Sequence, residues 1–133
     1  MIIINQETQD IAMTRGDYAA FVFNAYTDDG TTLYSLNQGD TVQLEVGKKY
    51  GGKLKEWKTP KENSLSTSST DYTIEIDPND TKDMKFGDYV YDVSIITADG
   101  KVYTYIGARE DENGNTIEPK FTILEEVGGE NDD

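Results

Sequence analysis

The side chains of this sequence that could do chemistry are mostly carboxylates, because it has 26 Asp and Glu residues but neither His nor Cys. Without His the chain lacks the commonest general base near neutral pH, and without Cys it lacks thiolate ligands and disulfides. Neither a nucleophile-elbow string nor a phosphate-binding glycine-rich loop is present. Among 26 carboxylates some pair will lie close by chance, so proximity alone would not indicate a glycosidase. We expect no enzyme activity, no catalytic residue and no cofactor.

Two acidic turns resemble calcium loops, since Ca²⁺ prefers carboxylate and carbonyl oxygens. In the segment 111–118, aligning Gly114 with the invariant glycine of an EF-hand places Arg109 at the first ligand position and Lys120 at the last. Cations at both positions rule out the match. The Asp28-Asp29-Gly30 turn likewise lacks an oxygen anion where one is required. Both segments are predicted to be solvated β-turns without a metal.

The net charge restricts the partners of the chain. Twelve Lys and Arg residues against 26 Asp and Glu residues give a charge of −14, which repels nucleic-acid phosphates and anionic lipid. We therefore expect no nucleic acid, no membrane and no small-molecule substrate as a partner. No segment approaches the ~20 apolar residues of a membrane span, and the N-terminus lacks the basic region of a signal peptide. The chain is expected to be soluble, made in the cytoplasm and not exported by a signal peptide.

Half of the cations lie in one short segment, the Lys hairpin of residues 48–61, which contains six Lys residues together with Tyr50, Leu54 and Trp57. One interpretation is a docking surface for the acidic face of another copy or partner. The other is a solvated hairpin whose Lys residues protect an edge strand. Trp57 favours contact, because Trp is enriched in interfaces. The predicted partner-binding residues are Lys48, Lys49, Tyr50, Lys53, Lys55, Trp57 and Lys58.

The elements that position these side chains are predicted to be strands, because apolar residues recur at every second position and helical periodicity is nearly absent. Asp-Gly, Asn-Gly and Gly-Gly turns separate the strands, and Gly51-Gly52 predicts a hairpin. About seven to eight short strands of this kind predict an all-β antiparallel sandwich. The alternating segments are 19–25, 41–46, 72–76, 89–95 and 121–123.

Four segments depart from the strand pattern. Asp77 and Pro78 predict one short helical turn, at the N-cap and first helical positions. Residues 61–70 are rich in Ser and Thr and are predicted to be a flexible polar loop. The Arg-Gly-Asp of residues 15–17 matches the integrin-binding tripeptide, but a turn between the first two strands explains it better. Residues 128–133 are predicted to be a flexible acidic tail after a single domain of residues 1–127.

The string from Gly87 to Val93 is the most informative about the fold. A Gly entering a strand, then Tyr89 two residues later, is the layout of a tyrosine corner, in which the tyrosine hydroxyl bonds to upstream backbone. Tyr91 stands where antibody domains carry their second Cys, and its ring could fill the same space. Gly87, Tyr89 and Tyr91 are therefore predicted to be structural residues of an immunoglobulin-like sandwich. The alternative is an ordinary tyrosine-rich strand.

Several segments together resemble small tail and baseplate proteins of phages and prophages of Gram-positive bacteria, especially the N-terminal domain of baseplate upper proteins. The resemblance implies an immunoglobulin-like, non-enzymatic virion protein that is assembled in the bacterial host cytoplasm, forms homo-oligomers in the particle and contacts other tail or baseplate proteins. The Ser/Thr-rich segment 61–70 and the acidic insert 107–118 depart from it. The resembling segments are 13–17, 29–30, Leu36, 39–42, 77–81, 86–93, 97–104 and 121–126.

Two other functions remain open from the residues alone. An acidic protein could imitate DNA and inhibit a host nucleic-acid enzyme, although the Lys hairpin interrupts its anions. A β-sandwich with Trp57 and several Tyr residues could instead be a carbohydrate-binding module, which would require exposed aromatic rings. A continuous negative stripe would favour the first, and binding on a glycan array would favour the second.

Overall fold

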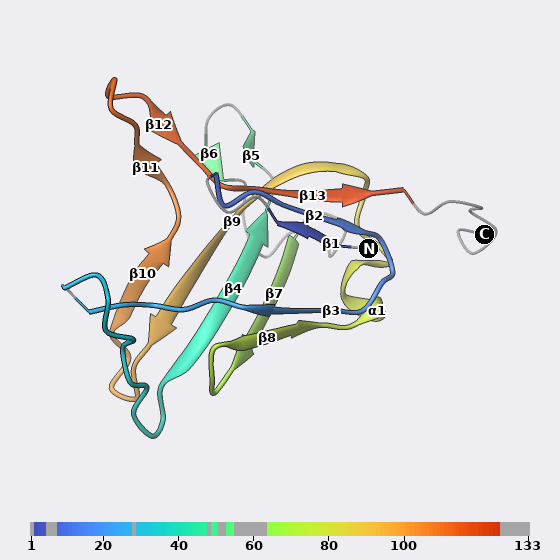
Figure 1. Ribbon diagram of the computed structural model, residues 1–133. Coiled ribbons are helices and arrows are strands. Elements are labelled where there is room, and N and C mark those ends of the chain that lie inside the picture. Colours follow the sequence, from blue (N-terminus) through green and yellow to red (C-terminus); the bar gives the residue numbers. More distant parts are fainter. Residues whose placement is uncertain are drawn as a thin grey trace.

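The computed structural model describes residues 2–4, 8–27, 29–47, 49–50, 53–54 and 64–125. These residues form thirteen strands and one short helix, so the predicted all-β class is confirmed. A curled larger sheet is packed against a smaller one, consistent with the predicted sandwich (Figure 1). The immunoglobulin-like topology stays a prediction.

The larger sheet has seven strands. In spatial order they are β1 (Ile2–Ile4), β2 (Ile11–Thr14), β13 (Lys120–Leu124), β9 (Gly87–Ile96), β4 (Thr41–Gly47) and β7 (Ser64–Ser69), and β10 (Val102–Ile106) also pairs with β9. Its strand pairs are antiparallel except β2 with β13, which run parallel. This pair is an exception to the predicted antiparallel arrangement, which the other pairs of the sheet follow. The two strands come from opposite ends of the chain, so no tight hairpin forces them to run in opposite directions.

The second layer consists of β3 (Ala19–Val22) and β8 (Thr73–Ile76), which pair antiparallel and cross one face of the larger sheet (Figure 1). The remaining strands form two short hairpins. β5 (Lys49–Tyr50) pairs with β6 (Lys53–Leu54), and β11 (Arg109–Glu110) pairs with β12 (Thr116–Ile117) in an arm that projects from the sandwich.

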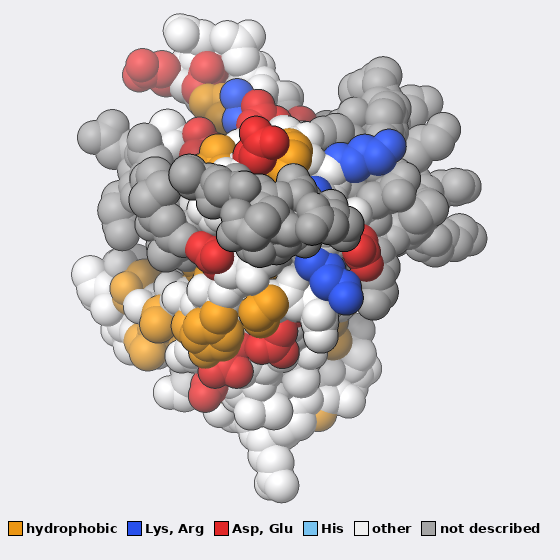
Figure 2. Space-filling view, turned by 90° about the vertical axis from the view of Figure 1, so that its right-hand side faces the viewer, with side chains coloured by type: hydrophobic (Ala, Val, Ile, Leu, Met, Phe, Trp, Pro, Cys, Tyr) orange, Lys and Arg blue, Asp and Glu red, His pale blue; other side chains and the backbone are white. Residues whose placement is uncertain are grey.

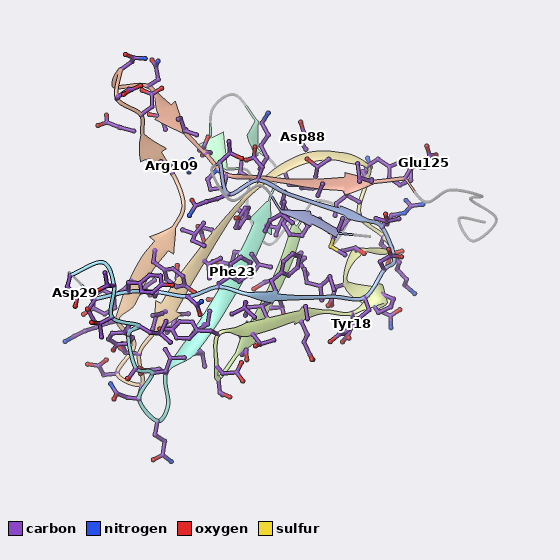
Figure 3. The ribbon with its side chains drawn as sticks, in the orientation of Figure 1. Tyr18, Phe23, Asp29, Asp88, Arg109 and Glu125 are labelled. Carbon is purple, nitrogen blue, oxygen red and sulfur yellow. The ribbon has the colours of Figure 1, made fainter. Side chains whose placement is uncertain are left out.

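The core lies between the two layers, and Phe23 is seen there in Figure 3. In β4, Val42, Leu44 and Val46 are buried while the residues between them are partly exposed, as the alternation predicts. Each such side chain contributes about 1.5–3 kcal/mol by leaving water. The buried rings meet in stacked, tilted and edge-to-face pairs, and the edge-to-face pair of Tyr91 and Phe121 has centroids 6.0 Å apart.

The prediction of a flexible loop at residues 61–70 is wrong for Ser64–Ser69, which form strand β7, whereas residues 61–63 lie outside the described residues. β7 pairs with β4 at six successive positions, from Val42 opposite Ser69 to Gly47 opposite Ser64. The pairing is made by backbone groups and does not depend on apolar side chains. One apolar residue, Leu65, is nonetheless buried in the core. A strand at a sheet edge therefore forms from a sequence with almost no hydrophobic pattern.

The predicted helical turn is confirmed as α1 (Pro78–Thr81). The Asp77 backbone N–H donates to the Asp80 carboxylate at 2.8 Å, which satisfies a backbone donor at the helix start. The Gly16 N–H donates to Thr81 Oγ1 at 2.8 Å. The turn that contains the Arg-Gly-Asp tripeptide is thus packed against α1, and the Arg15 guanidinium lies 4.1 Å from the centre of the Phe86 ring.

The face that carries α1 has a mixed surface. Figure 2 shows hydrophobic side chains gathered beside acidic ones there. Exposed large hydrophobic residues at this end of the fold include Tyr18 and Phe86. Tyr18 donates its hydroxyl proton to the Glu75 carboxylate at 3.0 Å, so its ring is held on the surface.

Candidate functional site

The predicted docking surface on the Lys hairpin lies largely outside the described residues. Lys49 pairs with Leu54 and Tyr50 pairs with Lys53, which confirms the antiparallel strand pair of the predicted hairpin, and Gly51-Gly52 lie outside the described residues. Lys48, Lys55, Trp57 and Lys58 lie outside the described residues. The role of this surface in binding a partner stays a prediction, as does the flexible tail of residues 128–133, which also lies outside them.

The hydrogen bond expected of a tyrosine corner is present at the start of β9. The Tyr89 hydroxyl donates to the Lys85 carbonyl at 2.7 Å, and its side chain is fully buried. Gly87 has φ +127°, a conformation that residues with a Cβ rarely adopt, and it pairs with Ile123 of β13. This corner fixes the path of the chain from α1 into the central strand of the larger sheet.

Tyr91 lies at the centre of the aromatic core, as a space-filling residue should. Its ring centroid is 6.4 Å from that of Phe23 and 6.0 Å from that of Phe121. Its hydroxyl donates to the Gln9 carbonyl. Burial raises the pKa of Tyr91, and the charge of Asp10 adds to the increase. The side chain is therefore a neutral structural group near pH 7.

A concave groove lies at the end of the sandwich away from α1, and we call it the tyrosine groove. It has a volume of about 730 Å³ and lies between the 25–40 segment and the β9–β10 hairpin. Figure 3 shows this end of the fold near Asp29. Its lining includes four tyrosines from these two segments, together with amide, hydroxyl and carboxylate side chains. These tyrosines are Tyr26, Tyr34, Tyr103 and Tyr105.

A buried carboxylate joins the two walls of the tyrosine groove. Asp40 is 3% exposed, and its two oxygens accept from the Asn37 N–H at 2.9 Å and the Ala98 N–H at 3.3 Å. A buried carboxylate is costly unless it is hydrogen bonded, so these contacts hold the carboxylate and both loops in place. Gly39 lies in the same turn with φ +91°.

Two tyrosine hydroxyls fix the floor of the groove. Tyr72 donates to the Tyr34 carbonyl at 2.7 Å, and Tyr105 donates to the Phe23 carbonyl at 3.1 Å. Burial is the main cause that raises the pKa of both hydroxyls. Tyr34 and Tyr105 are thus held by main-chain contacts, while Tyr26 and Tyr103 remain more than half exposed. The groove has a rigid base and an aromatic rim.

The charged groups at the groove are mainly acidic. Lys101 Nζ lies 3.7 Å from an Asp99 carboxylate oxygen, and both side chains are well exposed. The Thr97 hydroxyl also donates to Asp99 and, as the largest cause, lowers the pKa of that carboxyl. With Asp40 on the inner wall, the two carboxylates outnumber the one cation of the lining.

The two acidic turns compared with calcium loops use their carboxylates to cap backbone groups. Asp29 accepts from the N–H groups of Thr31 and Thr32 and from two threonine hydroxyls, and the Thr32 hydroxyl is the largest cause of its strongly lowered pKa. Asp111 accepts from Asn113 and Asn115 N–H at 2.9 Å. In the part of the chain that the structure describes, no group of three or more acidic side chains is placed to hold a metal ion. The predicted turns are confirmed at residues 111–115 and at Asp29-Gly30, whereas Thr116–Ile117 form strand β12 and Asp28 lies outside the described residues.

A pair of carboxylates that the sequence did not reveal lies on the outer face of the larger sheet. Glu45 of β4 stands directly opposite Asp92 of β9. Burial raises the pKa of Glu45, and repulsion from Asp92 adds to the increase. Burial also raises the pKa of Asp92. The two carboxylates meet because of the register between β4 and β9, which no local sequence motif predicts.

Glu45→Gln is therefore expected to raise the free energy of unfolding at pH 7 by about 0.2–1 kcal/mol, the range for cross-strand pairs. A carboxyl with a raised pKa in the folded state binds protons more tightly there, so its unfavourable contribution develops as the pH rises through the raised pKa. The gain should vanish at pH ~3, where Glu is protonated in both states. Urea unfolding at the two pH values would measure it. Glu112→Gln, an equal charge change at an exposed turn, should show no such pH-dependent gain.

Comparisons of the chain with protein-family models, curated proteins and solved structures found no match. Within the described residues, no helix has the length and apolar character needed to cross a membrane.

Proposed function

We propose that this chain is a non-enzymatic assembly protein that acts through protein–protein contacts in a bacteriophage or prophage tail or baseplate. The tail assignment is supported by the resemblance of residues 11–127 to tail and baseplate domains. The physical support for assembly is separate and comes from the edges of the larger sheet.

The observation that carries the proposal is the outer edge of β10. Among the described residues, β10 pairs only with β9, so one side of the strand is open. Its sequence, Val-Tyr-Thr-Tyr-Ile, contains neither the charges nor the proline that usually protect an edge strand. Val102 is 60% exposed and Tyr103 is 58% exposed. A register shift between Thr104 and Ile106 limits the regular open edge to Val102–Thr104.

An open, uncharged edge suits strand addition, in which a partner supplies a strand and main-chain hydrogen bonds provide affinity. Apolar side chains along the edge add buried area to such a contact. The partner would be another copy of this chain or a neighbouring tail protein. Size-exclusion chromatography with light scattering, together with pull-downs against tail proteins encoded beside it, tests the proposal. A chain that stays monomeric at high concentration and binds no tail protein would contradict it.

Val102→Lys is expected to weaken self-association or tail-protein binding by at least about tenfold, because a charge on an open edge disfavours pairing. Analytical ultracentrifugation would measure the change. Val22→Lys is the matched control, since Val22 is 64% exposed and lies on β3 of the smaller sheet. If the control weakens association and Val102→Lys does not, the contact is not made by β10.

A further inference from the structure

The rim of the tyrosine groove presents two aromatic rings to solvent. Tyr26 is 54% exposed and comes from the segment after β3, whereas Tyr103 is 58% exposed and comes from β10. Neither hydroxyl has a hydrogen-bond partner among the residues that the structure describes. Single exposed apolar side chains are normal, but apolar surface that gathers beside a concave surface is a feature of ligand-binding grooves.

Polar side chains that can bind uncharged groups line the same groove as these rings. Asn37 and Gln38 each offer an amide with two donors and an acceptor, and Thr97 carries a hydroxyl. An apolar surface with a few convergent polar groups is the usual composition of a ligand site. A sugar ring has the matching chemistry, since its C–H face packs on an aromatic ring while hydroxyls at its edge bond to amides and carboxylates.

The size and charge of the groove restrict the ligand further. A volume of about 730 Å³ falls within the range of small-molecule sites, about 300–1,000 Å³, and suits one or two sugar rings better than an extended polymer. Asp40 and Asp99 make the lining acidic, and Lys101, the cation of the lining, lies beside Asp99. The net charge of −14 adds to the repulsion of anions. The ligand is therefore neutral.

The groove is also held in shape before any ligand arrives. Asp40 links the segment before β4 to the β9–β10 turn, and the hydroxyls of Tyr72 and Tyr105 anchor the floor to main-chain carbonyls. A preformed site loses less entropy on binding, which raises affinity for a small ligand.

From these observations we propose that the tyrosine groove binds a neutral mono- or disaccharide, with Tyr26 and Tyr103 as stacking surfaces and the amides of Asn37 and Gln38 as hydroxyl partners. This site goes beyond the proposed assembly function and does not depend on it.

The test is a titration of the ¹⁵N-labelled full chain followed by NMR, with glucose, galactose, N-acetylglucosamine, cellobiose, lactose and chitobiose as probes. We expect at least one probe to shift amide signals of residues 25–40 and 95–105 in a saturable manner. Tyr103→Ala and Tyr26→Ala should each weaken that binding about tenfold, through loss of a stacking surface. Tyr103→Phe, which keeps the ring, should bind nearly as well as the unchanged chain.

Tyr18→Ala is the matched control, because Tyr18 is 56% exposed and lies at the opposite end of the fold (Figure 3). Equal loss in Tyr18→Ala and Tyr103→Ala would overturn the proposal. The proposal would also be overturned if none of the six sugars gave saturable shifts and no neutral glycan on an array bound the chain, with or without calcium. If only a proline-rich peptide, and no sugar, shifted the amide signals of the groove residues, the proposal would likewise be overturned. Because Val102→Lys addresses the strand edge, failure of saccharide binding and failure of assembly are separate results.

Discussion

Tyr91→Ala is expected to lower the free energy of unfolding by about 3–5 kcal/mol, the cost of removing a large buried aromatic side chain. The ring is packed between Phe23 and Phe121, which belong to different layers of the sandwich. Its removal would leave a cavity where the two layers meet. Because single domains have a total stability of about 5–15 kcal/mol, the variant would be near the limit of folding. Urea unfolding followed by tyrosine fluorescence and circular dichroism would measure the loss.

Tyr91→Phe distinguishes the contribution of the ring to stability from that of the hydroxyl. This variant keeps the packing and loses only the hydrogen bond to the Gln9 carbonyl, so a loss of about 0.5–1.5 kcal/mol is expected. Gln9 has φ +67°, and its side chain also accepts from Arg109 Nη1 at 3.3 Å. The hydroxyl therefore helps to hold the strained residue that leads into β2. A loss in Tyr91→Ala no larger than that in Tyr91→Phe would show that the ring is not a core element.

Gly39→Ala is expected to lower the free energy of unfolding by about 2–5 kcal/mol, through two effects that add. An Ala at φ +91° is strained by about 1–2 kcal/mol. A Cβ at this position would also lie 2.7 Å from the Ala98 Cβ, which forces the two turns apart at a further cost of about 1–3 kcal/mol. Both turns line the tyrosine groove, so amide signals of residues 37–40 and 97–100 should shift as well. Thermal unfolding and an NMR spectrum would check the two effects.

Gly114→Ala is the control for Gly39→Ala. Gly114 has φ +82°, and a Cβ there would meet nothing within 4 Å. It should therefore show only the backbone strain of about 1–2 kcal/mol, with no change at the groove. If the two variants lose equal stability, the contact between Gly39 and Ala98 does not restrict the fold, and the groove walls are less closely coupled than their geometry indicates.

Local patterns in the sequence determined the elements in which side-chain chemistry and backbone conformation agree. The alternation in 41–46 and 89–95 specified two central strands, because a half-buried strand exposes every second residue to water. Asp77 and Pro78 specified the start of α1, because a cap and a proline satisfy or remove backbone donors at that position. The spacing of Gly87 and Tyr89 predicted a tyrosine hydroxyl bond to upstream backbone, and the structure identifies the acceptor as the Lys85 carbonyl.

Only the tertiary structure decided which distant segments meet. β7 forms from a Ser/Thr-rich segment because its backbone pairs with β4. The residues of the segment itself do not predict this pairing. Register alone brought Glu45 opposite Asp92, since pairing between strands depends on contacts across the whole sheet. The tyrosine groove likewise joins two segments far apart in the sequence, 25–40 and 95–105, through Asp40. The sequence alone excludes chemistry that needs His or Cys and shows that Tyr is abundant. Long-range packing decides that four of the tyrosines line one groove.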